Sequence, residues 1–450
     1  MKKSIHRREF LEKTSKVAVA PLLTPLVSAA AIKPGEPQKK KYALVGTGVR
    51  GTHAWGKPIT QEYGDHLELV ALCDINMARL AHAKEVIGTK APMYHSSEFE
   101  KMISQNQPDT VVITTTDCFH ATYARKAMEL GCDVLSEKPL VTEAQQGQEI
   151  VDVEQRTGKK ITTTFNARFG SSTEEIKRII SSGELGRVIS AEYQEYLDVD
   201  HGASYFRRWH GKKRYSGSLL VHKASHHFDQ MNWWLDSEPE TVNAFGKVAF
   251  YGKNHSFRAR NCRSCQFKDQ CEFYWDINKY GSKDFYLVGE SEDGYLRDGC
   301  VWDNDIDTYD TMTVEVKYAN EVILSYSLNA YMPYEGQMIA FNCEQGRLEV
   351  RNYHRQPWEV AVAADFRITK SFKDTKAWSI PPSTGEHGGA DKRLRDKLFL
   401  PNQPDTLNQV AGSRAGLMSS LIGIAAVQSI ETNKQVKISD LVNFPLSWGW

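Results

Sequence analysis

The sequence predicts an α/β protein whose N-terminal part is a doubly wound parallel sheet. Three observations predict it: short apolar segments alternate with helix-length segments, a glycine-rich turn follows the first apolar segment, and an aspartate ends the second. Such alternation is typical of parallel strands joined by crossover helices. The chain has 450 residues, and a prior of roughly 100 to 200 residues per domain predicts two or three domains.

The first strand, residues 42–45, runs directly into the glycine-rich turn. This turn reads Gly46-Thr47-Gly48-Val49-Arg50-Gly51. In this spacing the first glycine permits a tight turn, the second lets the backbone approach a pyrophosphate, and the third allows close packing of helix on strand. Amides at the start of the following helix then face the phosphates. We therefore expect these six residues to bind a dinucleotide.

The second strand, residues 67–73, ends at Asp74. In a dinucleotide fold this carboxylate accepts hydrogen bonds from the adenosine ribose and would repel a 2′-phosphate, which favours NAD over NADP. Arg79 would soften that preference, and a helix-capping role for Asp74 is the alternative. A helix over 77–86, a strand over 110–115, a helix over 120–130 and a strand over 132–136 follow. The last strand leads into Lys138, which we expect at the nicotinamide because ligands sit at the carboxyl ends of such strands.

These motifs resemble the Gfo/Idh/MocA family, the glucose-fructose oxidoreductase and inositol dehydrogenase group. The resemblance rests on the glycine-rich turn, Asp74, a Thr-rich strand with His120 after it, Glu137-Lys138-Pro139, and Asn166-Ala167-Arg168-Phe169. It implies an NAD(P)-binding Rossmann domain over 40–160. A second α/β domain over 161–450, built on a large open, mainly antiparallel sheet, is implied as well. Residues implied to bind the cofactor are Thr115, His120, Glu137, Lys138 and Asn166, beside the turn and Asp74.

The later sequence agrees with such a sheet. Strand-length, partly alternating patterns occur at 188–193, 313–318, 322–328, 337–343 and 347–350. We expect a helix over 412–432 to pack back on the core.

The predicted chemistry lies in residues 219–229. In the family, an Asp-x-x-x-His pair on this helix is followed by an aspartate three residues later, which here aligns His226 with the family histidine and His222 with the family aspartate. We assign His226 as the base or acid, Lys138 as a hydrogen-bond donor to the same oxygen, and His222 as a relay. The i, i+4 spacing places both histidines on one helical face. With Asp229 they could instead ligate a metal, or be satisfied buried polar groups.

Aromatic and polar residues around this segment suggest a carbohydrate substrate. We expect Tyr205 and Trp209 to line the pocket, with Arg168, His201 and His226 as polar contacts. The loop from His387 to Asp391 either approaches the substrate or forms a surface turn.

Four cysteines cluster in an apparent insertion, about residues 250–305. Cys262, Cys265, Cys271 and Cys300 could form a structural zinc site or disulfides, and either would staple the insertion. The other four cysteines occur singly and are expected to be small buried hydrophobes.

The N-terminus, residues 1–31, has the features of a twin-arginine (Tat) export signal. Arg7 and Arg8 precede Phe10-Leu11, an apolar stretch over 17–26 is shorter than the ~20 residues of a membrane span, and small residues surround a cleavage site near Ala29 to Ala31. Cleavage would remove six basic and two acidic residues and move the formal net charge from zero to minus four. That balance argues against nucleic acid or membrane as partners. We expect export by the Tat machinery to the periplasm or medium.

Three functional hypotheses follow. The first is an NAD(P)-dependent oxidoreductase acting on a ring hydroxyl of a sugar in carbohydrate catabolism, with tightly bound NAD because free cofactor is scarce outside the cytosol. The second is an NAD-dependent glycoside hydrolase resembling glycoside hydrolase family 109. The third is a non-catalytic carbohydrate-binding protein. A homo-oligomer formed through the open sheet is expected, because the resemblance implies it.

Overall fold

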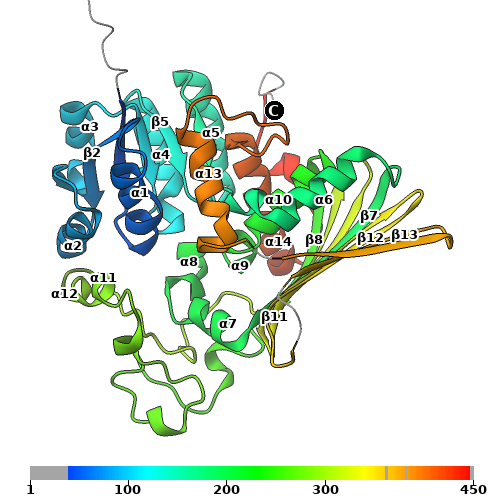
Figure 1. Cartoon of the computed structure of the whole chain (residues 1–450). Coiled ribbons are helices and arrows are strands. Elements are labelled where there is room, and N and C mark those ends of the chain that lie inside the picture. The colour runs from blue at the N-terminus through cyan, green and yellow to red at the C-terminus, as the bar shows by residue number, and fades with distance from the viewer. Residues whose placement is uncertain (1–38, 360–362, 382, 446–450) are drawn as a thin grey trace, which may run out of the picture. The chain divides into compact units, whose positions relative to one another are not determined.

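The computed structural model describes residues 39–359, 363–381 and 383–445 and contains two β-sheets (Figure 1). The predicted export signal lies outside these residues.

The N-terminal sheet has seven strands in the order β15-β6-β5-β4-β1-β2-β3. Six strands pair in parallel, and the short β15 pairs antiparallel with β6. The strands are β1 (Lys40–Val45), β2 (Leu67–Asp74), β3 (Met93–His95), β4 (Thr110–Ile113), β5 (Asp133–Ser136), β6 (Ile161–Thr163) and β15 (Ala411–Gly412). The predicted doubly wound parallel sheet is confirmed, with one short strand added from the far end of the chain.

Helices cover both faces of this sheet because its strands are apolar on both sides. Leu44 of β1 belongs to a buried apolar cluster with Trp55 and Leu394, whereas the next residue, Val45, belongs to another cluster with Met102 and Ala124. The face with the first cluster carries α1 (Lys57–Gln61), which follows a π-helical turn (η1, Gly51–Gly56), together with α2 (Met77–Ile87) and α13 (Ala390–Phe399). The face with the second cluster carries α3 (Phe99–Asn106), α4 (His120–Glu129) and α5 (Ala144–Thr157).

The C-terminal sheet has nine strands in the order β14-β13-β12-β11-β7-β10-β9-β8-β16. Only β7 and β10 pair in parallel. The strands are β7 (Val188–Asp198), β8 (Pro239–Lys247), β9 (Thr311–Tyr318), β10 (Ile323–Met332), β11 (Glu335–Cys343), β12 (Gly346–Arg355), β13 (Ala364–Lys370), β14 (Asp374–Ile380) and β16 (Val436–Lys437). The large, mainly antiparallel sheet is therefore confirmed.

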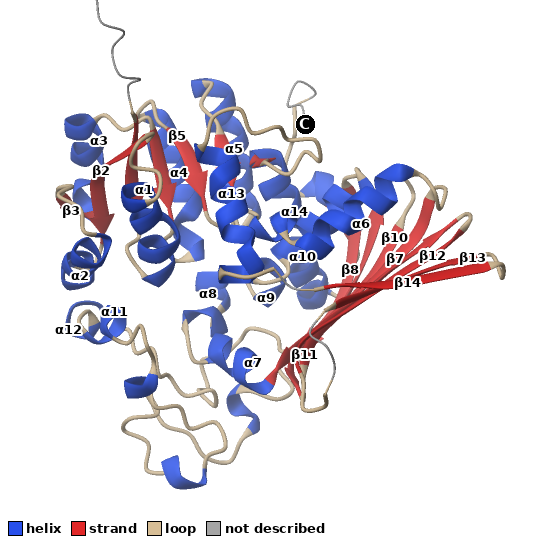
Figure 2. Ribbon diagram, viewed as in Figure 1, coloured by secondary structure: helices blue, strands red, loops and turns tan. Residues whose placement is uncertain are grey.

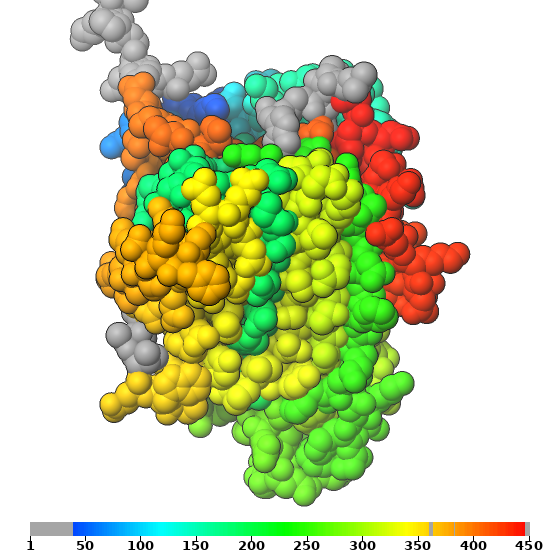
Figure 3. Space-filling model, turned by 90° about the vertical axis from the view of Figure 1, so that its right-hand side faces the viewer, coloured from blue at the N-terminus to red at the C-terminus, as the bar shows by residue number. Residues whose placement is uncertain are grey.

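One face of the C-terminal sheet is packed and the other is open. Phe228 of α10 (Ser225–Leu235) and Leu417 of α14 (Ser413–Thr432) belong to the core that includes Tyr326 of β10, and α6 (Ser171–Ser182) packs on α10. Figure 3 shows the other face, where the strands lie side by side and no described helix covers them. In the described residues α14 alone is long and apolar enough to cross a membrane, but 61% of its most apolar window is buried inside the protein.

The remaining helices lie beneath the two sheets or in the insertion (Figure 2). They are α7 (Val199–Phe206), α8 (Lys213–Ser216), α9 (Leu219–His222), α11 (Asp284–Leu287) and α12 (Glu290–Asp293). The last two belong to the segment between β8 and β9, which returns to the N-terminal sheet and packs beside α2.

Candidate active site

The glycine-rich turn connects β1 to η1 and leaves open space at one position. Gly46 has a φ of +89°, a backbone conformation that favours glycine. A Cβ added at Gly51 would lie 2.1 Å from the carbonyl oxygen of Gly46, whereas one added at Gly48 would meet no atom within 4 Å. Gly46 and Gly51 therefore serve the turn, and the space at Gly48 fits the pyrophosphate of a dinucleotide.

Asp74 organises this turn from the end of β2. Its Oδ2 accepts hydrogen bonds from the Thr47 amide at 2.6 Å and the Thr47 hydroxyl at 3.0 Å, and its Oδ1 accepts from Asn76 N and Arg79 Nη2. The N-cap of α2 is Asn76, which accepts from Arg79 N. The capping alternative for Asp74 is therefore wrong, and the carboxylate stands beside the turn where a dinucleotide fold places the ribose.

Arg50 of the turn is held by two carboxylates. Its Nε donates to Glu137 at 2.7 Å, and its two Nη atoms donate to Asp391 at 2.8 and 3.0 Å. Asp391 also accepts from Asn166 Nδ2, and its other oxygen lies 2.7 Å from His387 Nδ1. The pKa of Asp391 is well below its ordinary value because His387 and Arg50 outweigh its burial. The loop from His387 to Asp391 thus braces the turn from the C-terminal part of the chain.

Lys138 follows β5 at the carboxyl edge of the parallel sheet. Its Nζ donates to the His222 carbonyl oxygen at 2.7 Å and lies 3.5 Å from His222 Nε2. Burial lowers the pKa of Lys138 to about 8, against the opposing effect of Asp117 and Glu137. The amine therefore has a lowered pKa and faces the predicted histidine segment.

His222 forms a pair with a carboxyl group that sequence reasoning missed. Its Nδ1 lies 2.6 Å from Asp117 Oδ2, and both side chains are largely buried. Burial lowers the pKa of His222 well below its ordinary value, and Lys138 lowers it further. Asp117 follows β4, so it comes from the same sheet edge as Lys138. Two features of the sequence could have identified Asp117: it follows a strand that ends at the same sheet edge as Lys138, and it lies between the Thr-rich strand and His120.

The segment carrying the two histidines is not one continuous helix, which corrects the prediction of a shared helical face. α9 ends at His222, and α10 begins at Ser225. The His222 carbonyl oxygen, which would close the next helical turn, accepts instead from Lys138 Nζ and Ser225 Oγ. His226 lies on α10, packs edge-on against Phe165 at 5.8 Å, and has no hydrogen-bond partner at Nδ1.

Aromatic rings surround His222. Tyr205 and Trp209 meet its ring edge-on at 5.6 and 5.7 Å, and His210 lies at 4.2 Å. His201 stacks on Tyr205 and lies 2.9 Å from Glu335 Oε1. The structure therefore brings the predicted pocket residues Tyr205, Trp209 and His201 to the catalytic candidates, and adds His210, which no local pattern marked.

Two predicted ligand contacts have structural partners instead. Arg168 donates to both oxygens of Asp229 at 2.7 Å, with 6% and 1% of the two side chains exposed. His120 has Nδ1 at 2.7 Å from the Pro139 carbonyl and Nε2 at 3.0 Å from the Thr115 carbonyl. Arg168 thus braces α10, and His120 joins the loops after β4 and β5. Because Asp229 pairs with Arg168, the His-His-Asp metal alternative is not supported.

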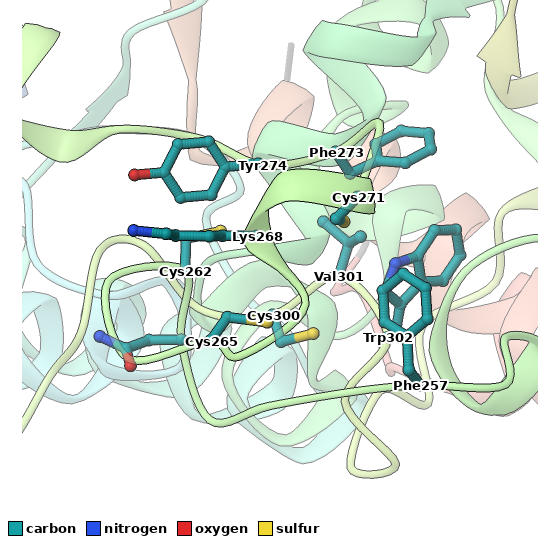
Figure 4. A pocket seen from close by; sticks show the side chains of 11 residues that line it. Phe257, Cys262, Cys265, Lys268, Cys271, Phe273, Tyr274, Cys300, Val301 and Trp302 are labelled. Atoms are coloured by element: carbon teal, nitrogen blue, oxygen red, sulfur yellow. The ribbon is translucent and has the colours of Figure 1, made fainter.

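The four cysteines of the insertion lie together. Cys262, Cys265, Cys271 and Cys300 line one cavity of about 20 Å³ with aromatic neighbours (Figure 4). None of the eight cysteines forms a disulfide. Within the described ranges no group of three or more His, Cys, Asp or Glu side chains has the arrangement of a metal site.

Two family profiles match the chain. The "Oxidoreductase family, NAD-binding Rossmann fold" of Gfo/Idh/MocA matches residues 40–165, and the "Oxidoreductase family, C-terminal alpha/beta domain" matches residues 177–438. The chain belongs to the Gfo/Idh/MocA family. It is therefore an NAD(P)-dependent oxidoreductase, and the hypothesis of a non-catalytic binding protein loses its support.

The relatives of this chain include the YteT protein of Bacillus subtilis, which is 32% identical over 89% of this chain and 98% of that protein. Inositol 2-dehydrogenase of Salmonella typhimurium is 27% identical over 46% of this chain and 57% of that protein. D-glucoside 3-dehydrogenase of Escherichia coli is 29% identical over 27% of this chain and 34% of that protein.

Two solved structures share the fold. The WlbA dehydrogenase of Bordetella pertussis, solved with NADH and UDP-GlcNAcA, has a TM-score of 0.61 at 19% identity and covers 91% of this chain and 100% of its own. Aldose-aldose oxidoreductase of Caulobacter crescentus has a TM-score of 0.60 at 15% identity, with 89% and 100% covered.

Proposed function

We propose that this protein is an NAD-dependent dehydrogenase that oxidises a ring hydroxyl of a sugar or sugar derivative in carbohydrate catabolism. The observation that carries the proposal is the position of Lys138. Its amine lies against His222 at the edge of the parallel sheet that also presents the open space at Gly48. Relatives named for inositol and glucoside oxidation support a polyhydroxylated ring as substrate.

The proposed roles divide between three side chains. His226 accepts the proton of the substrate hydroxyl as the C–H bond breaks, and Lys138 donates a hydrogen bond to the same oxygen as negative charge develops on it. Bound NAD⁺ would supply the hydride acceptor for this oxidation, whose product would be a ketone. His222, fixed by Asp117, holds Lys138 and orients it toward that oxygen.

The pocket wall suits a pyranose. Tyr205 and Trp209 offer flat apolar surfaces beside His222, while His201 offers a polar edge that Glu335 orients. Aromatic faces pack on the C–H faces of a sugar ring, and a few placed polar groups select its hydroxyls.

Reduction of NAD⁺ by a panel of monosaccharides and disaccharides tests this function. We expect wild type to form NADH with at least one sugar, and Lys138→Met to bind that sugar but to lose turnover. Sugar binding without NADH formation in wild type, with every sugar of the panel, would contradict the proposal.

A redox-neutral glycoside hydrolase is the second candidate, and the twin arginines at Arg7 and Arg8 favour it. Oxidation acidifies a neighbouring C–H, elimination expels the aglycone, water adds, and the held hydride returns to the ketone. Such an enzyme needs no supply of cofactor after export. Release of 4-nitrophenol from 4-nitrophenyl glycosides without added NAD⁺ would select this candidate, whereas NADH accumulation would select the dehydrogenase.

Export and tight retention of NAD belong together in this proposal. Fusion of residues 1–31 to a reporter that is active only after Tat export tests the signal, with Arg7→Lys/Arg8→Lys as the control. Denaturing natively purified protein and measuring the nicotinamide released tests retention. A molar ratio of NAD(H) to protein near one supports it, and empty protein contradicts it.

The cysteine cavity is proposed to staple the insertion, by a structural zinc ion or by disulfides. The proposal rests on the four thiols that line one small cavity, although the described cysteines form no disulfide and do not have the arrangement of a metal site. Metal analysis and thiol titration of the exported protein separate them. One zinc per chain supports the ion, missing titratable thiols without zinc support disulfides, and eight titratable thiols without metal contradict both.

A homo-oligomer is proposed through the open face of the C-terminal sheet. Ile189, Phe245 and Ile323 on its strands are exposed, which supports a covered face in the assembled protein. Light scattering after size exclusion tests it, with Ile189→Lys/Ile323→Lys expected to yield monomers.

A further inference from the structure

The insertion between β8 and β9 closes on the first turn of α2. Glu292 accepts hydrogen bonds from Met77 N at 2.7 Å and Ala78 N at 3.1 Å. Asn76 Nδ2 donates to the Gly289 carbonyl at 2.8 Å and to Asp293 at 2.9 Å. These contacts join a segment of the C-terminal part of the chain to the end of β2, where Asp74 stands.

A contact between aromatic rings adds to these hydrogen bonds. The ring of Phe285 on α11 meets His53 edge-on at 5.4 Å and His82 at 4.7 Å. His53 belongs to η1, directly after the glycine-rich turn, and His82 lies on α2. The insertion therefore contacts both elements that flank the adenosine end of a dinucleotide site.

The positive charge of Arg79 is compensated by two carboxylates, one of them from the insertion. Its Nη2 donates to Asp74 Oδ1 and its Nη1 to Asp293 Oδ2, each at 3.0 Å, and 16% of its side chain is exposed. An arginine near this position is what accommodates the 2′-phosphate of NADP, and a helix N-terminus attracts anions. Here Arg79 donates hydrogen bonds to two carboxylates, and Glu292 accepts hydrogen bonds from the first amides of α2.

We propose that Phe285, Glu292 and Asp293 form a clasp that retains NAD and excludes NADP. The inference rests on the proposed NAD-dependent function and assigns residues outside the dinucleotide fold to cofactor choice. A 2′-phosphate would meet the carboxylates of Asp74, Glu292 and Asp293, and Arg79 there is already paired with Asp74 and Asp293. Release of NAD requires the clasp to separate from α2, so the clasp acts mainly on the dissociation rate.

The test compares an isosteric double variant, Glu292→Gln/Asp293→Asn, with Glu272→Gln, a change at an exposed carboxyl of the same insertion. Each full-length protein is loaded with NADH, and its fluorescence is followed during a chase with excess NAD⁺. Calorimetric titration with NAD⁺ and NADP⁺ then yields the preference. We expect the double variant to release NADH at least about tenfold faster and to prefer NAD⁺ at least about tenfold less, while Glu272→Gln matches wild type.

Unchanged release and unchanged preference in a folded double variant would overturn the clasp. Wild type that binds no nicotinamide cofactor at all would overturn the proposed function instead, so the two failures are distinct. If the double variant does not fold, Glu292→Gln alone carries the release measurement and Asp293→Asn alone carries the preference measurement. The same two outcomes then decide.

Discussion

His222 Nδ1 lies 2.6 Å from Asp117 Oδ2, across the boundary between α9 and the loop that follows β4. His222 stands where the family resemblance led us to expect an aspartate, and the carboxyl group of this site comes from a different element. The carboxyl group that this helix lacks is supplied by the loop after β4, where burial raises the pKa of Asp117 well above its ordinary value. The contact also occupies one ring nitrogen and leaves Nε2 facing Lys138.

Asp117→Asn is expected to lower kcat/KM by about 10- to 100-fold, the effect of removing a group that orients a functional side chain. The physical reason is that an amide keeps the shape but holds the His222 ring less firmly. Steady-state kinetics across pH, with Asp152→Asn on the exposed side of α5 as control, measures it. Wild-type kinetics at every pH in Asp117→Asn would contradict a role for the pair.

Lys138 predicts a pH dependence. Because its pKa is about 8 and the charged amine is the hydrogen-bond donor, kcat/KM should fall as pH rises above about 8. The effect on stability has the opposite sign. Because the pKa of Lys138 is about 8 in the folded protein and 10.5 ordinarily, the unfolded chain binds more protons between these two pH values. The free energy of unfolding therefore rises with pH from about 8 to 10.5. Lys138→Arg should move the alkaline fall in activity to higher pH, and a fall that stays in place would assign it to another group.

Gly48→Ala and Gly51→Ala form a matched pair. The alanine at 51 would collide with the Gly46 carbonyl oxygen, so we expect loss of stability, whereas the alanine at 48 meets no protein atom. Gly48→Ala should therefore unfold at the wild-type temperature and bind NAD⁺ at least about tenfold more weakly. Calorimetry measures both properties. Normal NAD⁺ affinity in Gly48→Ala would place the pyrophosphate elsewhere.

Asp229→Asn tests whether Arg168 is structural. Removing one partner of a buried ion pair costs about 3 to 5 kcal/mol, because the remaining charge is left without compensation. Urea unfolding should show that loss of unfolding free energy, and Asp65→Asn on the surface should show none. A stable Asp229→Asn variant with a raised KM for sugar would instead indicate that Arg168 contacts the substrate.

The sequence alone determined the elements whose signals are local. Strand β2 and helix α2 were predicted to within a residue because apolar periodicity and the aspartate at the strand end belong to neighbouring residues, and Lys138 was found because its motif is contiguous. That Asp74 and Lys138 lie at the same edge of the sheet follows from its parallel topology, because both residues come at or after the carboxyl end of a strand.

Only the tertiary structure decided which side chains meet across elements. Asp117 joins His222, Arg168 joins Asp229 instead of a ligand, and Glu292 reaches the amides of α2. No periodicity encodes such contacts, because each depends on how distant segments pack rather than on spacing along the chain. Burial in those contacts also sets the pKa of Lys138, a property that its sequence motif does not contain.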